Sequence, residues 1–364
     1  MDLDNGTPFP AAFTVVVDVE GREHAVVVVK GTFDFPDDPH KTCAPSAQPV
    51  PLILADTFWG EPGFSSPRAE MDFAHVKARC DVLLEATAHA PDGRATEQMR
   101  AGLRIGSWTK VIDVVGDRVW LGGLGAPGIS APRPFVQMPL SYDRAFGGVD
   151  GAEPDPDKAD AYRANPVGRG WSRVENAARV NGVALPNLED PADPVREPWG
   201  RNTPMSFGPL GRGWSDRLPL AGTYDEAWQE EVFPFLPKDF NPDYYQAAAA
   251  DQQIPFPKPG TEIVLAGLTP EGQTAFRLPE IEMPMLFAVS RKEDVPKTGL
   301  LDTIVIEPDL RRFSLTWRAS LPLQRDIFEI NECIIGARPK GFWRARAMGK
   351  SYYPSLGDLV RTGR

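Results

Sequence analysis

The sequence predicts a mainly β protein, in which antiparallel strands form sandwich-like or open-barrel-like sheets around a long irregular middle region with a few short helices. Segments rich in Val and Phe, bounded by Gly and Asp turns, fill the first and last thirds of the 364-residue chain. Helix-start signals are confined to two places in the middle. Of the 38 prolines, 20 lie between residues 121 and 260. That stretch is also aromatic and aliphatic, which indicates ordered irregular backbone rather than a disordered linker.

Three hairpins are predicted in the first third. Residues 12–19 and 24–35 alternate like strands and are joined by a turn at 20–23. The unbroken run Val26-Val27-Val28-Val29 predicts a strand covered on both faces. Residues 77–90 and 96–105, joined by Pro91-Asp92-Gly93-Arg94, predict the second hairpin. Residues 108–115 and 118–121, joined by Gly116-Asp117, predict the third.

Two helices are predicted in the middle region. Thr223 and Glu226 have capping-box spacing, which predicts a helix that ends before Pro234. Asn241 is suited to be an N-cap, and Pro242 would occupy the first helical position, where its missing N–H costs nothing. Four alanines should propagate this second helix as far as Pro255.

The last third returns to strands, at residues 261–268, 273–278, 285–290, 300–307 and 311–320. Residues 325–337 could form a helix or a strand, because their apolar residues fit neither period cleanly. The predicted organisation is an N-terminal β-rich region (1–124), an irregular region with short helices (125–260) and a C-terminal β-rich region with a basic tail (261–364). One β-rich body with a long insertion is the alternative.

Composition excludes several classes of protein. The net charge of −11 and pI of about 5.0 oppose binding to nucleic acid or acidic membranes. No apolar run approaches the roughly 18 residues that a membrane span needs, and the start has no apolar signal segment. Three scattered cysteines fit a reducing compartment. We therefore expect a cytoplasmic protein with neither membrane insertion nor nucleic-acid partner.

No reaction centre is evident in the sequence. The histidines His24, His40, His75 and His89 are isolated, and no HExxH, GxSxG or phosphate-loop motif is present. We therefore predict no catalytic residue, cofactor site or metal site. The abundant carboxylates leave glycoside chemistry open as an alternative.

The pentapeptide GRGWS occurs twice, at residues 168–172 and 211–215. One interpretation is structural. The glycines permit unusual backbone angles, Arg forms forked hydrogen bonds to carbonyls or carboxylates, and the Trp side chain anchors the loop to the body of the protein. The other is a surface for a partner, because Arg and Trp are enriched at interface hot spots. The tail from Arg338 to Arg364 carries seven basic residues and one acidic residue. It either folds back on the acidic body or docks an acidic partner.

An ordered set of motifs resembles a known bacterial family. In chain order these are the strands at 13–33, DFAHVKARCDVLLEATAHAPDG, PLSYDRAFGG, NPVGRGW, LPNLE, FGP, WSDR, AGTYDEAW, FLPKDFNPDYYQAAAADQQ and GTEIVLAGLTPEG. They are similar to those of uncharacterised-domain proteins encoded in type VI secretion clusters. The resemblance runs through most of the chain and is weakest at the C-terminus.

The resemblance implies a non-enzymatic cytoplasmic adaptor and chaperone. Such proteins hold a toxic effector, often one with a proline-alanine-alanine-arginine-repeat tip domain, and help to load it onto the valine-glycine-repeat spike. The alternatives are a carbohydrate-active enzyme or sugar-binding β-sandwich, and a structural part of the secretion apparatus. The predicted partner-binding residues are Tyr142, Arg144, Phe146, Arg169, Trp171, Trp214, Arg217, Tyr224, Trp228, Arg344 and Arg346.

Overall fold

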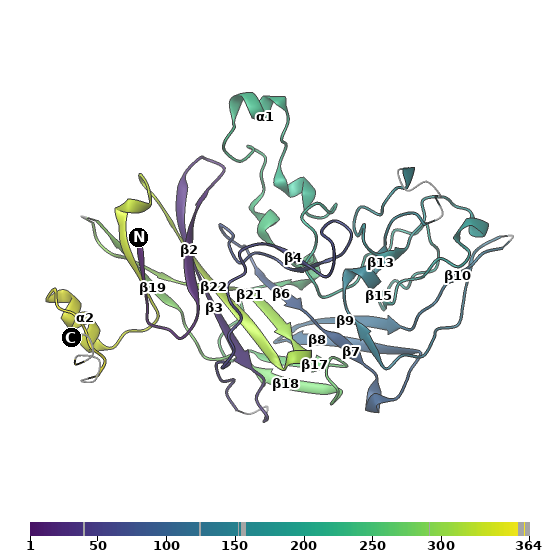
Figure 1. Cartoon of the computed structure of the whole chain (residues 1–364), viewed down its shortest axis with the longest axis horizontal. Helices are drawn as coiled ribbons and strands as arrows, with labels where there is room; N and C mark the ends of the chain where they lie inside the picture. The colour runs from purple at the N-terminus through teal and green to yellow at the C-terminus, as the bar shows by residue number, and fades with distance from the viewer. Residues whose placement is uncertain are drawn as a thin grey trace.

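The computed structural model describes residues 1–38, 41–123, 125–151, 153, 158–290, 292–355 and 360. These residues form a mainly β structure with mostly antiparallel sheets, as the sequence predicts. His40, Arg361 and Arg364 lie outside the described residues. Figure 1 shows an elongated molecule with β19 and α2 toward one end and β10, β13 and β15 toward the other.

The central sheet has six strands in the order β16-β6-β21-β22-β3-β2. β6 and β21 run parallel, and the other neighbours are antiparallel. Strands from both ends of the chain therefore share one sheet. The strand bounds are β16 Gln253–Ile254, β6 Cys80–Leu84, β21 Leu300–Glu307, β22 Arg312–Pro322, β3 Glu23–Asp34 and β2 Ala11–Val17.

Two further sheets pack around this one. The five-stranded sheet is antiparallel throughout: β15 Leu188–Glu189, β9 Trp108–Val115, β8 Gln98–Ile105, β17 Glu262–Ala266 and β18 Gln273–Arg277. The four-stranded sheet contains β1 Asp2–Asn5, β23 Ile330–Ile335, β19 Pro284–Val289 and β20 Val295–Thr298.

Short ladders and helices complete the fold. The ladders are β10 Trp120–Leu121 with β11 Gly128–Ile129, β7 Thr87–His89 with β12 Gln137–Pro139, β13 Phe146–Gly147 with β14 Arg169–Gly170, and β4 Thr57–Phe58 with β5 Pro67–Ala69. The α-helices are α1 Glu226–Glu231 and α2 Lys340–Ala347. The 3₁₀ turns are Pro91–Gly93, Tyr142–Arg144, Ala177–Val180, Leu218–Ala221, Pro242–Tyr245, Ala250–Gln252, Pro308–Leu310 and Ile327–Glu329.

One hydrophobic core joins the three large sheets. Phe313 of β22 stacks on Phe276 of β18, with ring centroids 4.9 Å apart, so the central and five-stranded sheets meet face to face. The Val26–Val29 run of β3 is fully buried. It lies between β2 and β22 with both faces covered, which explains why its sequence does not alternate.

The first predicted hairpin is confirmed as β2–β3, but the second and third are wrong. β6 pairs with β16 and β21 rather than with β8. β8 instead forms a tight hairpin with β9, in which Ile105 faces Trp108. Gly106 occupies the first position of that two-residue loop with φ +57°, as such hairpins favour. The Gly106-Ser107 pair is thus the turn, in place of the four-residue loop at 91–94 and the two-residue loop at 116–117.

The first predicted helix forms as α1, although Asp225 caps it instead of Thr223. The second predicted helix is wrong. Asn241 does cap a turn, but that turn is a short 3₁₀ segment, Pro242–Tyr245. The buried Asp81 carboxylate accepts hydrogen bonds from the backbone N–H groups of Ala247 and Ala248 at 2.8 and 3.3 Å. These amides are therefore unavailable to a helix, and tertiary contacts override the propensity of alanine.

Residues 325–337, for which the sequence leaves helix and strand open, contain a 3₁₀ turn followed by strand β23. The strands predicted at 261–268 and 273–278 are confirmed as the β17–β18 hairpin. Strands β19, β21 and β22 also lie where the sequence predicts them.

Candidate functional site

The first GRGWS loop packs against the segment that contains Tyr142 and Phe146. β14, within the loop, pairs in parallel with β13, so that Arg169 lies beside Phe146. The Asn165 side-chain amide donates to the carbonyls of Tyr142 and Phe146 at 2.8 and 3.1 Å. Arg169 Nε donates to the Asp143 carbonyl at 2.9 Å, which is one hydrogen bond to a carbonyl and not a fork. Two distant motifs thus form one junction.

Aromatic rings also pack against one another at this junction. Phe146 meets Tyr162 edge to face at 5.2 Å, and Tyr162 lies 5.7 Å from the Trp171 ring. The buried Trp120 donates its indole N–H to the Gly170 carbonyl at 2.9 Å. Together with Val180 these rings belong to a small second core. The first GRGWS loop is therefore part of the interior framework.

The second GRGWS loop reaches the same segment through different contacts. Trp214 packs edge to face on Tyr142, with ring centroids 5.2 Å apart. Arg212 Nε donates to Asp56 Oδ2 at 2.7 Å. Arg217 binds both carboxylate oxygens of Glu70 at 2.8 and 2.9 Å and also donates to two backbone carbonyls. The two GRGWS copies therefore hold opposite sides of one interior junction.

Burial and neighbouring charges shift the pKa values of this junction. Burial, and then the charge of Arg144, lower the pKa of Arg169. Burial also acts to lower the pKa of Arg212, but the hydrogen bond to Asp56 and the charge of Glu70 outweigh it and raise that pKa. Burial raises the pKa of Tyr142, whose hydroxyl has no hydrogen-bond partner among the described residues. These shifts favour the charged form of Arg212 and the neutral form of Tyr142, whereas the shift at Arg169 disfavours its charged form.

The third positions of the two GRGWS copies, Gly170 and Gly213, provide a matched test. Gly170 has φ +92°, and a Cβ there would lie 2.7 Å from Pro186. At Gly213, a Cβ would meet no atom within 4 Å in the described part of the chain. We expect Gly170→Ala to lower the free energy of unfolding by about 1–3 kcal/mol. Gly213→Ala should change it by no more than about 1 kcal/mol. Urea unfolding measures both, and equal losses would contradict the distinction.

Four predicted partner-binding residues lie in the interior. The exposed fractions are 1% for Tyr142 and Phe146, 2% for Arg217 and 7% for Trp214. Their side chains support the junction and present little surface to another molecule. Arg144, Arg169 and Trp171 are half-buried at its margin.

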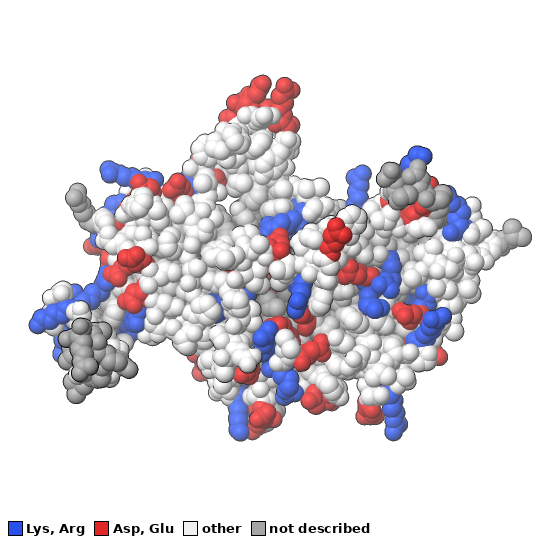
Figure 2. Space-filling view, viewed as in Figure 1, with Lys and Arg blue, Asp and Glu red and all other residues white. Residues whose placement is uncertain are grey.

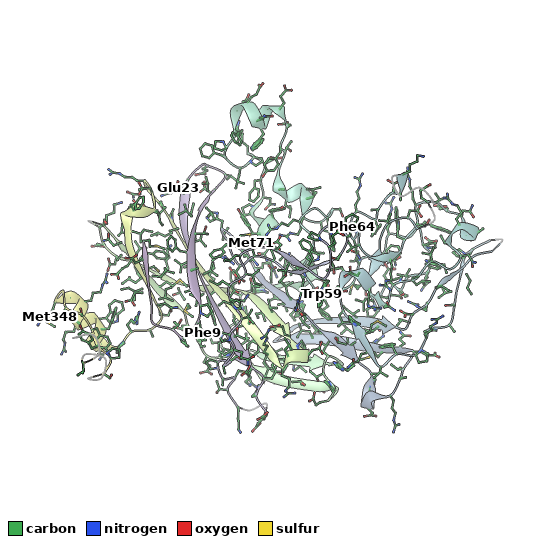
Figure 3. All side chains as sticks on the ribbon, in the orientation of Figure 1. Phe9, Glu23, Trp59, Phe64, Met71 and Met348 are labelled. Carbon is green, nitrogen blue, oxygen red and sulfur yellow. The ribbon has the colours of Figure 1, made fainter. Side chains whose placement is uncertain are left out.

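A surface cleft of about 510 Å³ borders the junction. Arg144 and Arg169 line it together with Trp59, which Figure 3 labels. The Arg68 guanidinium lies 5.0 Å from the Trp59 ring centroid. The cleft also contains four carboxylates, from Glu85, Asp143, Glu307 and Asp309. Its mixed charge and partly covered aromatic ring are suited to polar protein contacts.

Tyr224 and Trp228 lie on a separate projection, residues 222–240, which we call the arm (Figure 1). Trp228 packs edge to face between Tyr224 at 4.7 Å and Phe233 at 5.6 Å. Its indole N–H donates to the Phe235 carbonyl at 2.9 Å. Thr223 binds Asp239 through its N–H and hydroxyl, closing the base of the arm. The arm is thus internally braced although it projects from the body.

The surface of the arm is aromatic and acidic. Tyr224, Phe233 and Phe235 are 55%, 65% and 45% exposed. Figure 2 shows acidic side chains gathered at its tip. Those in and next to α1 are Asp225, Glu226, Glu230 and Glu231, all exposed. Such a surface favours a partner with apolar and basic groups.

Arg344 and Arg346 lie on α2, far from the arm (Figure 1). Arg344 is exposed. Arg346 forms ion pairs with Glu332 and Asp294. Arg338, at the start of the basic tail, pairs with Asp4. These contacts correspond to the interpretation in which the tail folds back onto the body, and they do not join α2 to the arm.

Sequence reasoning missed several exposed aromatic residues. Trp59 and Phe64, in the β4–β5 hairpin, are 48% and 80% exposed (Figure 3). The available signal was the stretch FWGEPGF, in which aromatic residues flank the turn formers Gly and Pro and follow neither a strand nor a helix period. Phe233 and Phe235, beside Pro234, carry the same signal.

Within the described ranges, no group of three or more His, Cys, Asp and Glu side chains is placed to hold a metal ion. His24 lies in β3, where it approaches Asp18 Oδ2 at 2.8 Å, and its ring lies 4.1 Å from that of His75. His89 lies in β7. No described helix has the length and apolarity needed to cross a membrane.

Comparison with known proteins gives one family match. Residues 20–318 match the family model described as "Uncharacterized protein conserved in bacteria (DUF2169)". No curated protein and no solved structure matches the chain. The matched span contains the five-stranded sheet, both GRGWS loops, the arm, and the central sheet except for β2 and the end of β22. The chain therefore belongs to the DUF2169 family of conserved bacterial proteins.

Proposed function

We propose that this protein is a non-enzymatic cytoplasmic adaptor and chaperone, which binds a type VI secretion effector and helps to load it onto the spike. The arm is the observation that carries the proposal. Its aromatic side chains are exposed although internal contacts brace the backbone that holds them. Exposed aromatic groups on a rigid support are typical of protein-binding surfaces.

The motif set in the sequence indicates the kind of partner, a type VI secretion effector. That set resembles adaptor proteins of type VI secretion clusters. The arm contains all but the first residue of AGTYDEAW, and FLPKDF, which begins the motif FLPKDFNPDYYQAAAADQQ. The interior positions of Tyr142, Phe146 and Trp214 give several other motifs a structural role. The arm, the cleft beside Arg144 and Arg169, and the exposed Arg344 are the candidate contact surfaces that follow.

Co-purification with the toxin encoded beside the gene tests the function directly. We expect the tagged full-length protein to retain that toxin through size-exclusion chromatography and to raise its soluble yield. An adaptor should remain in the cells, whereas a structural part of the spike should appear in secreted material. Failure to bind any cognate effector or spike protein would contradict the proposal, and recovery in the secreted particle would favour a structural role.

Charge reversal on the arm tests where the partner binds. We expect Glu230→Lys/Glu231→Lys to slow association with the effector about tenfold at low salt, because steering by the acidic tip is reversed. Both side chains are exposed, so thermal stability should stay unchanged. Surface plasmon resonance at two salt concentrations measures the effect.

The matched control is Glu280→Lys/Glu282→Lys, which makes the same change in net charge. Both of these residues are exposed in the connection between β18 and β19. This variant should associate nearly as fast as the wild-type protein. Equal slowing in the two variants would show that net charge, and not the arm, is responsible.

A further inference from the structure

Strand β2 leaves one edge of the central sheet open. It is the last strand in the sheet order, and on its outer side no strand pairs with it in the described ranges of the chain. Its inner side pairs antiparallel with β3 from Ala11↔Val29 to Val17↔Glu23. Figure 1 shows β2 along the margin of the sheet, with its hairpin pointing to the side from which α1 projects.

The register determines which backbone groups of β2 point outward. Lys30 N donates to the Pro10 carbonyl, and Asp18 N donates to the Arg22 carbonyl, each at 3.0 Å. Hydrogen-bonded and non-bonded pairs alternate in an antiparallel ladder, so the even-numbered residues of β2 bond to β3. The odd-numbered residues direct their N–H and C=O groups away from β3; these are Ala11, Phe13, Val15 and Val17.

This edge lacks the features that usually prevent strand pairing. Natural edge strands carry charges, prolines or bulges. β2 has the sequence AAFTVVV, with no charge and no proline, and it pairs with β3 without a register shift. Phe13 and Val15 are 37% and 36% exposed on the face that they share. The edge is therefore regular, apolar and available.

The arm adjoins one end of this edge. A Cβ built on Gly21, in the β2–β3 turn, would lie 3.4 Å from the Phe235 ring of the arm. The turn itself contributes acidic side chains, and Figure 3 labels Glu23 at the end of the hairpin on the arm side. The turn and its flanks carry Asp18, Glu20 and Glu23 against Arg22, so this end of the edge is acidic on balance.

We propose that the outer edge of β2 binds an extended segment of the partner protein by strand addition. The segment has alternating apolar side chains, which cover Phe13 and Val15, and at least one Lys or Arg at the end beside the arm. The proposal rests on the proposed function for the identity of the partner, the effector. A second copy of this chain fits poorly, because its own acidic hairpin and net charge of −11 would be repelled.

Two substitutions of Val15 separate the contribution of its backbone N–H to partner binding from that of its side chain. Val15→Pro removes an outward N–H without removing a bond to β3, which an edge strand tolerates. Val15→Thr keeps the N–H and the β-branched shape. We expect Val15→Pro to raise the Kd for the purified cognate effector at least about tenfold, whereas Val15→Thr should stay within about twofold. Val16→Pro, which removes an inward N–H, should instead lower the Tm.

Hydrogen exchange gives a readout that does not depend on a variant. In the free protein the amides of Phe13, Val15 and Val17 should exchange quickly, and those of Thr14 and Val16 slowly. Adding the effector should protect the odd-numbered amides. Unchanged exchange at these amides in the complex, or equal effector binding by Val15→Pro and Val15→Thr, would overturn strand addition.

The outcomes separate this inference from the proposed function. If the effector binds the wild-type protein and Val15→Pro equally well, strand addition is wrong and the adaptor function stands. If the effector binds neither, the adaptor function is wrong and the inference falls with it. A concentration-dependent dimer that Val15→Pro abolishes would assign the edge to a second copy and overturn the proposed occupant; light scattering measures this.

Discussion

Asp81→Ala is expected to lower the free energy of unfolding by about 3–5 kcal/mol, because it leaves a buried ammonium group without its partner. Asp81 is fully buried and accepts from Lys77 Nζ at 2.7 Å. It also binds the Gln246 side chain and two alanine amides. Burial acts to lower the pKa of Lys77, but the charges of Asp81 and Asp302 outweigh it and raise that pKa. Urea unfolding monitored by tryptophan fluorescence measures the loss.

Asp160→Ala is the matched control for this variant. Asp160 also forms an ion pair, with Arg173, but the two side chains are 45% and 68% exposed. Exposed pairs contribute little, so the loss should be below about 1 kcal/mol. A loss as small for Asp81→Ala would show that water or another group replaces the buried carboxylate.

Trp214→Ala should cost about 3–5 kcal/mol of unfolding free energy, because it opens a cavity between the second GRGWS loop and Tyr142. The Trp214 side chain is 7% exposed and supports the buried Tyr142 ring edge to face. Thermal and urea unfolding of the purified protein measure the loss. Effector binding should weaken only as far as the folded fraction falls.

Arg346→Ala should cost much less stability than Trp214→Ala. The Arg346 side chain is 29% exposed, and its guanidinium pairs with Glu332 and Asp294 near the surface. The cost in stability should stay below about 1 kcal/mol, and any effect should fall on partner binding and its salt dependence. A larger loss of stability for Arg346→Ala than for Trp214→Ala would contradict the assignment of Trp214 to the interior framework.

The candidate site was only partly predictable. Arg and Trp in the GRGWS loops suit an interface and a braced turn equally well, because both uses favour large side chains that bind at low entropic cost. The burial of these side chains distinguishes an interface from a braced turn. Whether a side chain is buried depends on which residues of other segments pack against it. Tyr142 lies opposite Trp214, from a motif far along the chain, whereas Tyr224 packs on Trp228, a near neighbour within the arm.

The sequence by itself determined the mainly β class, the covered Val26–Val29 strand, the β2–β3 and β17–β18 hairpins and the cap at Asn241. Each of these depends on a local period or a turn within a few residues. Only the tertiary structure decided that β6 lies parallel to β21 and that Ala247 stays outside a helix. These features depend on partners distant in sequence, whose hydrogen bonds and burial leave no local pattern.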